Sequence, residues 1–178
     1  MIDCTTIEQG GFYVNKTIKI SLQLLFFIYL ILLSKLILLK YYSFNGTIDQ
    51  LLFRGESLFF LKEYNLIPFH TITAYIQAEG TTPFSAFKNL AGNIIGFIPF
   101  GIFMALLFFK KPTIIKIIVS TFSLSFIYEL IQLIFRLGTF DVDDLLLNTL
   151  GGLIGFLIYK LLYSIIKSNW IGYTKLDR

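Results

Sequence analysis

Four apolar stretches, each long enough to cross a lipid bilayer, constrain the fold of this chain more than any other feature. A transmembrane helix needs about 20 predominantly apolar residues. The chain is 56% hydrophobic and 15% charged, a composition more apolar than that of ordinary soluble domains. We therefore predict an all-α integral membrane protein, a compact four-helix transmembrane bundle. We place its spans at about residues 17–39, 83–109, 113–135 and 143–166.

Residues 40–82 form the one long connection between the predicted spans. It contains apolar clusters at 51–53 and 58–61, which are too short to cross a bilayer. We expect this loop to carry short interfacial helical segments that lie on the membrane or pack on the bundle. A signal peptide is the competing interpretation of the stretch 17–39. Because no small-x-small cleavage pattern follows this long run, we favour a retained anchor.

Basic residues are divided unequally between the two ends of the predicted bundle. Nine of the 15 lysines and arginines fall in the N-terminal segment, the 110–116 turn and the chain from Lys160 onward. The opposite end has the other six, together with eight of the 11 acidic residues. The positive-inside rule predicts a multi-pass plasma-membrane protein whose segments 1–16 and 167–178 are cytoplasmic. The positive net charge then reflects topology and contact with membrane lipids rather than nucleic-acid binding.

Polar side chains gather near the end of the third span and the start of the fourth. The spacing of Glu129, Gln132 and Arg136 places them on one helix face, and Asp144 and Asn148 lie one turn apart. Inserting a charged side chain into a membrane costs about 2.5–3.5 kcal/mol, so these groups should face protein, water or a ligand. We predict an outward-facing, partly hydrated pocket lined by Asn89, Asn93, Glu129, Gln132, Arg136, Asp141, Asp144 and Asn148.

Three blocks of the sequence resemble the signature motifs of the VanZ-like family, in the family's order and approximate spacing. The blocks are 64–69 (YNLIPF), 89–101 (NLAGNIIGFIPFG) and 129–155. The resemblance covers about residues 20–165, so we expect a VanZ-like membrane domain over 17–166. It implies an envelope protein of Gram-positive type that lowers the binding of teicoplanin-type glycopeptide antibiotics at the cell surface. Besides pocket residues, the matching positions are Asn65, Pro68, Pro99, Gly101, Gly151 and Gly155.

Close packing of the second and fourth spans is the structural role that we expect for glycine. Gly92 and Gly151 in particular are predicted to lie at this seam, because small residues let helix backbones approach closely in membranes.

Three accounts of the polar residues remain open from the sequence. They join helices structurally, they bind a ligand, or they catalyse a reaction on a lipid head group. In the second account, Arg136 suits a phosphate or carboxylate of a lipid-linked cell-wall precursor or of a glycopeptide antibiotic. In the third, Glu129, Asp141 and Asp144 are the catalytic candidates, and Asp141, Asp143 and Asp144 are candidate ligands for Mg²⁺ or Ca²⁺. We favour recognition, since no established catalytic motif is present and no cofactor is firmly implied.

Overall fold

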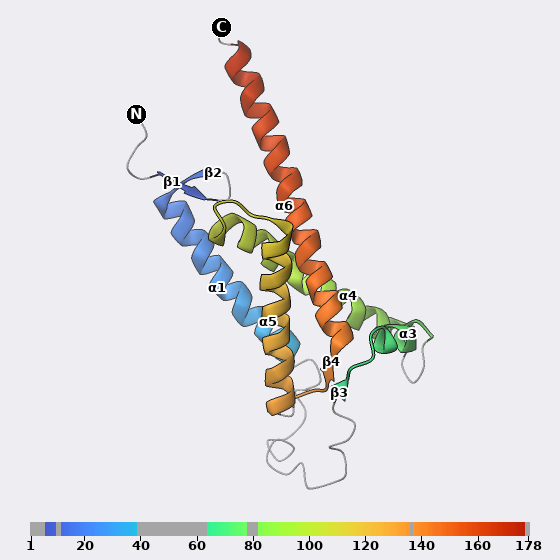
Figure 1. Ribbon diagram of the computed structural model, residues 1–178. Helices are drawn as coiled ribbons and strands as arrows, with labels where there is room; N and C mark the ends of the chain where they lie inside the picture. The colour runs from blue at the N-terminus through green and yellow to red at the C-terminus, as the bar shows by residue number, and fades with distance from the viewer. Residues whose placement is uncertain (1–5, 10–11, 39–63, 78–81, 136, 177–178) are drawn as a thin grey trace.

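The computed structural model describes residues 6–9, 12–38, 64–77, 82–135 and 137–176. Four of the described helices are long and apolar enough to cross a membrane, and they pack together as a bundle (Figure 1). This architecture confirms the predicted all-α membrane fold. The helices are α1 (Lys16–Leu38), α4 (Pro83–Phe103) with the π-helix η2 (Met104–Phe108) that continues it, α5 (Ile114–Ile134) and α6 (Val142–Leu176).

The smaller elements lie at opposite ends of the bundle (Figure 1). Strands β1 (Thr6–Gln9) and β2 (Phe12–Asn15) form an antiparallel hairpin before α1, at the end where α6 also terminates. Strands β3 (Tyr64–Asn65) and β4 (Phe140–Asp141) pair in parallel at the other end, beside helix α3 (His70–Ile76). We refer to these as the hairpin end and the α3 end.

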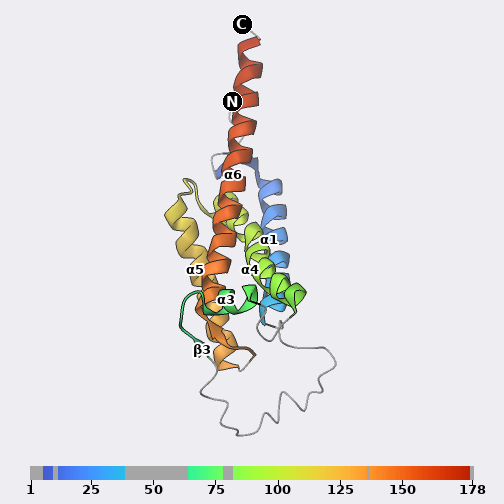
Figure 2. The ribbon, with the colours of Figure 1, turned by 90° about the vertical axis from the view of Figure 1, so that its right-hand side faces the viewer.

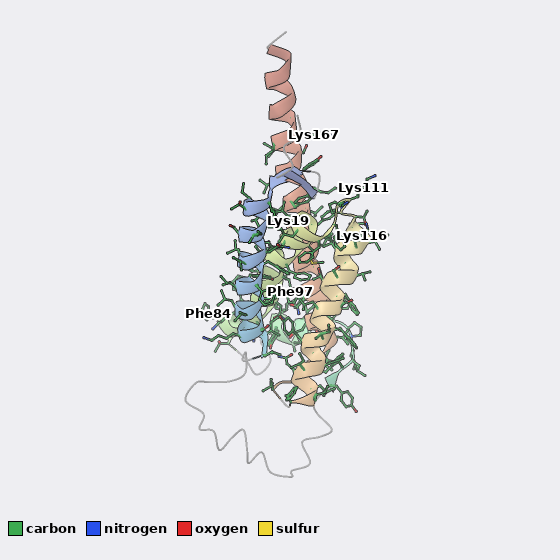
Figure 3. The ribbon with its side chains drawn as sticks, turned by 90° about the vertical axis from the view of Figure 1, so that its left-hand side faces the viewer. Lys19, Phe84, Phe97, Lys111, Lys116 and Lys167 are labelled. Atoms are coloured by element: carbon green, nitrogen blue, oxygen red, sulfur yellow. The ribbon has the colours of Figure 1, made fainter. Side chains whose placement is uncertain are left out.

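The described lysines are concentrated toward the hairpin end. Figure 3 shows Lys19, Lys111, Lys116 and Lys167 in the half of the bundle near this end, whereas Phe84 lies at the α3 end. The two ends therefore differ in charge as well as in structure.

An aromatic core joins α1, α4 and α5 in the middle of the bundle. Phe26 of α1 packs near Phe100 of α4, with ring centroids 6.1 Å apart. Phe97 is fully buried and belongs to the same cluster as Tyr128 of α5. Burial of these large side chains supplies the van der Waals contact that holds membrane helices together.

Glycines allow α4 and α6 to cross in direct backbone contact. A methyl group added at Gly101, Gly151 or Gly155 would lie 2.0–2.1 Å from a carbonyl oxygen of the facing helix. At Gly92, in contrast, no atom of the part of the chain that the structure describes lies within 4 Å of such a methyl group. The prediction that Gly92 lies at the seam is therefore wrong. Its side of α4 continues to Gly96, which faces α1 rather than α6.

Two helices differ in detail from the predicted spans. Pro99 lies inside α4, and the helix changes to the π-helix η2 shortly after it, as expected where proline removes a regular backbone hydrogen bond. Helix α6 continues past the predicted end at Ile166 to Leu176 and has 35 residues. At ~1.5 Å per residue it is longer than the ~30 Å hydrocarbon core, and its last turns extend beyond the other helices (Figures 1 and 2).

Candidate functional site at the α3 end

One face of α5 carries a row of polar side chains that the bundle buries. Thr121, Ser125, Glu129 and Gln132 are each at most 2% exposed. Their three- and four-residue spacing places them along one side of the helix. The exposed side chains of α5, such as Ile115 at 70%, are largely apolar. The polar row thus faces neighbouring helices, while apolar side chains cover the surface available to lipid.

Glu129 connects the end of α5 to the start of α6. Its Oε2 accepts the backbone N–H of Asp141 at 2.8 Å. Glu129 is 1% exposed and Asp141 8%, so this bond lies away from solvent. A buried carboxylate is costly unless donors satisfy it. The bond fixes where the chain turns back into α6.

A set of hydrogen bonds joins β3 and α3 to β4. The hydroxyl of Thr71 donates to Asp141 Oδ2 at 2.6 Å. The amide of Asn65 donates both to Thr71 Oγ1 at 2.9 Å and to Asp141 Oδ1 at 3.1 Å. The backbone N–H of Asp143 completes the set by donating to Asp141 Oδ1 at 2.9 Å. Asn65, a motif position, therefore holds its segment against the α5–α6 connection.

The carboxylate of Asp143 caps α3 from another part of the chain. It accepts the backbone N–H groups of Phe69 at 2.5 Å, Thr71 at 2.8 Å and Ile72 at 3.1 Å. Phe69 precedes α3 in a left-handed conformation, with φ of 68°, and supplies no side-chain cap. Pro68 lies in the turn just before it. Asp143 thus supplies the acceptor that the first turn of a helix requires.

Two further contacts join α6 to its neighbours inside the bundle. The amide of Asn93 on α4 donates to Asp144 Oδ1. One turn further along α6, the amide of Asn148 donates to Ser125 Oγ on α5 at 2.8 Å. Asn148 is 2% exposed, and its Oδ1 has no hydrogen-bond partner among the described residues. The predicted proximity of Asn93 to Asp144 is therefore present in the structure.

The remaining predicted pocket residues are directed elsewhere. Gln132 donates to the backbone carbonyl of Ile37 on α1 at 2.9 Å, and Asn89 donates to the Tyr75 hydroxyl of α3 at 3.2 Å. Arg136 lies outside the described residues. The structure thus distributes the predicted pocket residues over contacts to α1, α3, α4 and β4, instead of turning them all toward one point.

The carboxylates do not form a preorganised metal site. Among the residues that the structure describes, no three His, Cys, Asp or Glu side chains are arranged to hold a metal ion. The oxygens of Asp141 and Asp143 instead accept N–H and O–H donors of the chain. The predicted Mg²⁺ or Ca²⁺ site at Asp141, Asp143 and Asp144 is not supported, because these donors occupy the oxygens that a cation would need.

Sequence reasoning missed Thr71 and Tyr75. Both belong to α3, and both hydrogen-bond to predicted site residues, Thr71 to Asp141 and Tyr75 to Asn89. The motif at 64–69 ends just before Thr71 and Tyr75. Their closeness to this motif was the only sequence signal that could have identified them. Nothing in the local sequence indicates which distant side chains Thr71 and Tyr75 would meet.

Comparison with known proteins places the chain in a family. The family described as VanZ/LLP1 matches residues 26–163, which include α4, α5, the α3 segment and most of α6. The chain belongs to the VanZ/LLP1 family. It is also similar to Protein VanZ of Enterococcus faecium, with 32% identity over 123 residues that cover 67% of this chain and 71% of the relative. No solved structure matches the chain significantly. The protein is thus a multi-pass membrane protein of the VanZ type.

Proposed function

We propose that this VanZ-family protein acts at the bacterial cell surface and lowers susceptibility to teicoplanin-type glycopeptides. In this proposal it binds or modulates a lipid-linked head group, or the antibiotic itself, through the polar residues at the α3 end. The observation that carries the proposal is the gathering of Glu129, Asp141, Asp143 and Asp144 at this one end of a membrane bundle.

Stability alone is a weak reason for an acid at the edge of this gathering. An interhelical hydrogen bond in a membrane protein contributes only about 0.6 kcal/mol on average. Inserting a charged side chain costs about 2.5–3.5 kcal/mol on translocon scales. Bonds such as that between Ser125 and Asn148 therefore offset little of the cost of a nearby acid. Glu129, Asp141 and Asp143 accept hydrogen bonds from the chain that explain their burial, whereas for Asp144, at the half-buried edge, a functional requirement accounts better.

The charge of the two ends supports an outward-facing α3 end. Cytoplasmic ends of membrane proteins are rich in lysine and arginine. Lys19, Lys111, Lys116 and Lys167 lie toward the hairpin end (Figure 3). We therefore assign the hairpin end to the cytoplasm, which leaves the α3 end in contact with the cell surface.

Partial exposure separates ligand-contacting residues from scaffold residues within the cluster. Glu129 and Asp143 are buried, whereas Asn89 and Asp144 are half-buried. We assign Asn89 and Asp144 to the ligand-contacting edge and the buried acids to positioning. Arg136 follows α5 closely in the sequence, and its guanidinium suits a phosphate or carboxylate of the ligand.

The experiment is expression in a susceptible Gram-positive host, with inhibitory concentrations of teicoplanin and vancomycin measured in parallel. We expect the protein to raise the inhibitory concentration of teicoplanin several-fold.

Glu129→Gln and Asp144→Asn should reverse this increase at unchanged membrane levels of the protein. Each amide side chain can still accept a hydrogen bond, but it has lost the charge. Thr139→Ala, at an exposed position of the α5–β4 connection, is the matched control and should retain protection. The proposal would be contradicted if wild-type protein inserted normally into the membrane and the inhibitory concentration of teicoplanin stayed the same as in the host without it.

A further inference from the structure

The segment from Tyr64 to Ile76 exposes large apolar side chains. Leu66, Ile67 and Phe69 are more than half exposed, and Ile76 at the end of α3 is 73% exposed. In water these side chains would form an unfavourable surface. Because they lie beside a bundle that spans a membrane, their exposure is unfavourable if they face water but not if they face lipid.

The backbone N–H groups from Ile67 to Thr73 need no water as a partner. Ile67 N–H donates to Asn65 Oδ1 at 3.2 Å, and His70 N–H donates to the Ile67 carbonyl at 3.3 Å. Asp143 accepts the N–H groups of Phe69, Thr71 and Ile72, and Thr73 N–H donates to the Phe69 carbonyl at 2.9 Å. Pro68 has no N–H. Every backbone N–H from Ile67 to Thr73 therefore has an acceptor within the protein.

Such pairing of the N–H groups is what hydrocarbon demands of backbone donors. The first N–H groups of a helix have no partner within the helix and at a surface usually bind water or a local cap. Inside a bilayer each unsatisfied group costs several kcal/mol, so non-helical backbone occurs there only where the protein satisfies it. Asp143 provides this satisfaction for the start of α3, using a carboxylate that is itself fully buried.

The apolar surface of this segment continues onto a transmembrane helix. Tyr75 of α3 accepts a hydrogen bond from Asn89 of α4 at 3.2 Å, which holds the two helices together. Phe84 and Phe87 at the start of α4 are 76% and 68% exposed, and Phe87 begins the apolar span. Deeper along the same helix, Ile95 is 63% exposed. The exposed side chains of α3 thus adjoin the lipid-facing surface of α4.

We infer that the segment 64–77 is embedded in the leaflet at the α3 end, with its exposed apolar side chains among lipid acyl chains. The partner of this surface is the bilayer, rather than water or a second copy of the chain. Asp143 and Asp141 act as the buried anchors that make the insertion possible. The inference goes beyond the antibiotic-related role and does not depend on it.

The test uses single cysteines labelled with an environment-sensitive fluorophore, in protein reconstituted into nanodiscs. Cys4→Ser provides the background, and Ile67→Cys and Ile76→Cys report on the segment. Ile95→Cys is the control for a lipid-facing site, and Lys111→Cys, exposed in the α4–α5 turn, is the control for water. Quenching is measured with aqueous iodide and with nitroxide-labelled lipids.

We expect the labels at Ile67 and Ile76 to be quenched by nitroxide lipids, as at Ile95. Their iodide quenching should be several-fold weaker than at Lys111. Iodide quenching equal to that at Lys111 would show a water-exposed segment and overturn the inference. Protection from both quenchers would show that protein covers the segment, and would overturn it as well.

Discussion

Asp143 accepts the backbone N–H of Thr71 at 2.8 Å, although 72 residues of chain separate the two. The first turn of α6 therefore contains an acid that serves the start of α3. The neighbouring acid, Asp144, accepts instead from Asn93 of α4. Two consecutive carboxylates thus have different tasks, one holding the short helix and one lying at the half-buried edge between α4 and α6.

Replacing Asp143 by Asn should loosen α3 selectively. The amide keeps the size of the side chain but removes the charge, and its NH₂ group meets N–H donors where an oxygen stood. Hydrogen bonds to charged groups contribute about 1.5–3 kcal/mol each, so hydrogen exchange at Phe69, Thr71 and Ile72 should accelerate strongly. Asp144→Asn is the matched control on the same helix turn. Equal protection of these amides in both variants would exclude a capping role for Asp143.

The four membrane-spanning helices could be predicted from the sequence, because their apolar length and composition are local properties. The polar face of α5 also followed from the spacing of Glu129 and Gln132. The partners of these residues did not follow, because they depend on how separate segments meet. Asp143 fits the first turn of its own helix equally well by sequence, and only the packing of α3 against α6 shows which N–H groups it accepts.

The same limit explains the error at Gly92. A glycine in a membrane helix indicates close approach to a neighbour, but it does not identify which face meets which helix. Gly101, Gly151 and Gly155 face a partner backbone, whereas Gly92 does not. The face depends on the crossing of α4 and α6, which no local pattern specifies.

The α4–α6 seam should tolerate no added methyl group. Gly151→Ala places a carbon 2.1 Å from the Ile94 carbonyl oxygen, so the helices must separate. Overpacking of this kind costs about 1–3 kcal/mol, and the thermal unfolding temperature in detergent should fall. Gly92→Ala is the control and should leave that temperature unchanged or raise it, since alanine favours helix by up to about 1 kcal/mol. Equal effects of the two substitutions would contradict the observed seam.

Labelling of introduced cysteines should establish the orientation of the bundle. In a Cys4→Ser background, Thr139→Cys lies at the α3 end and Lys111→Cys in the turn between α4 and α5. With the lysine-rich end in the cytoplasm, a membrane-impermeant thiol reagent added to intact cells should label Thr139→Cys only. Permeabilised cells serve as the control, because both sites should then react. Selective labelling of Lys111→Cys would invert the proposed orientation and remove the α3 end from the cell surface.

The central claim is that Asp144 takes part in recognition and does not merely join two helices. Exchanging the side chains of Asn93 and Asp144 separates the role in recognition from the role in joining the helices. Asn93→Asp combined with Asp144→Asn keeps an amide and a carboxylate in contact across α4 and α6, but moves the charge from half-buried Asp144 to the site of Asn93, which is 5% exposed. The double variant should therefore fold and insert at wild-type levels.

The deciding measurement is the teicoplanin inhibitory concentration of cells with the wild-type protein, Asp144→Asn and the exchanged pair, at matched membrane levels. We predict that the wild-type protein protects and that both variants leave cells as sensitive as the empty host. Full protection by the exchanged pair would contradict this account, because the charge at Asp144 would then serve only to hold α4 against α6.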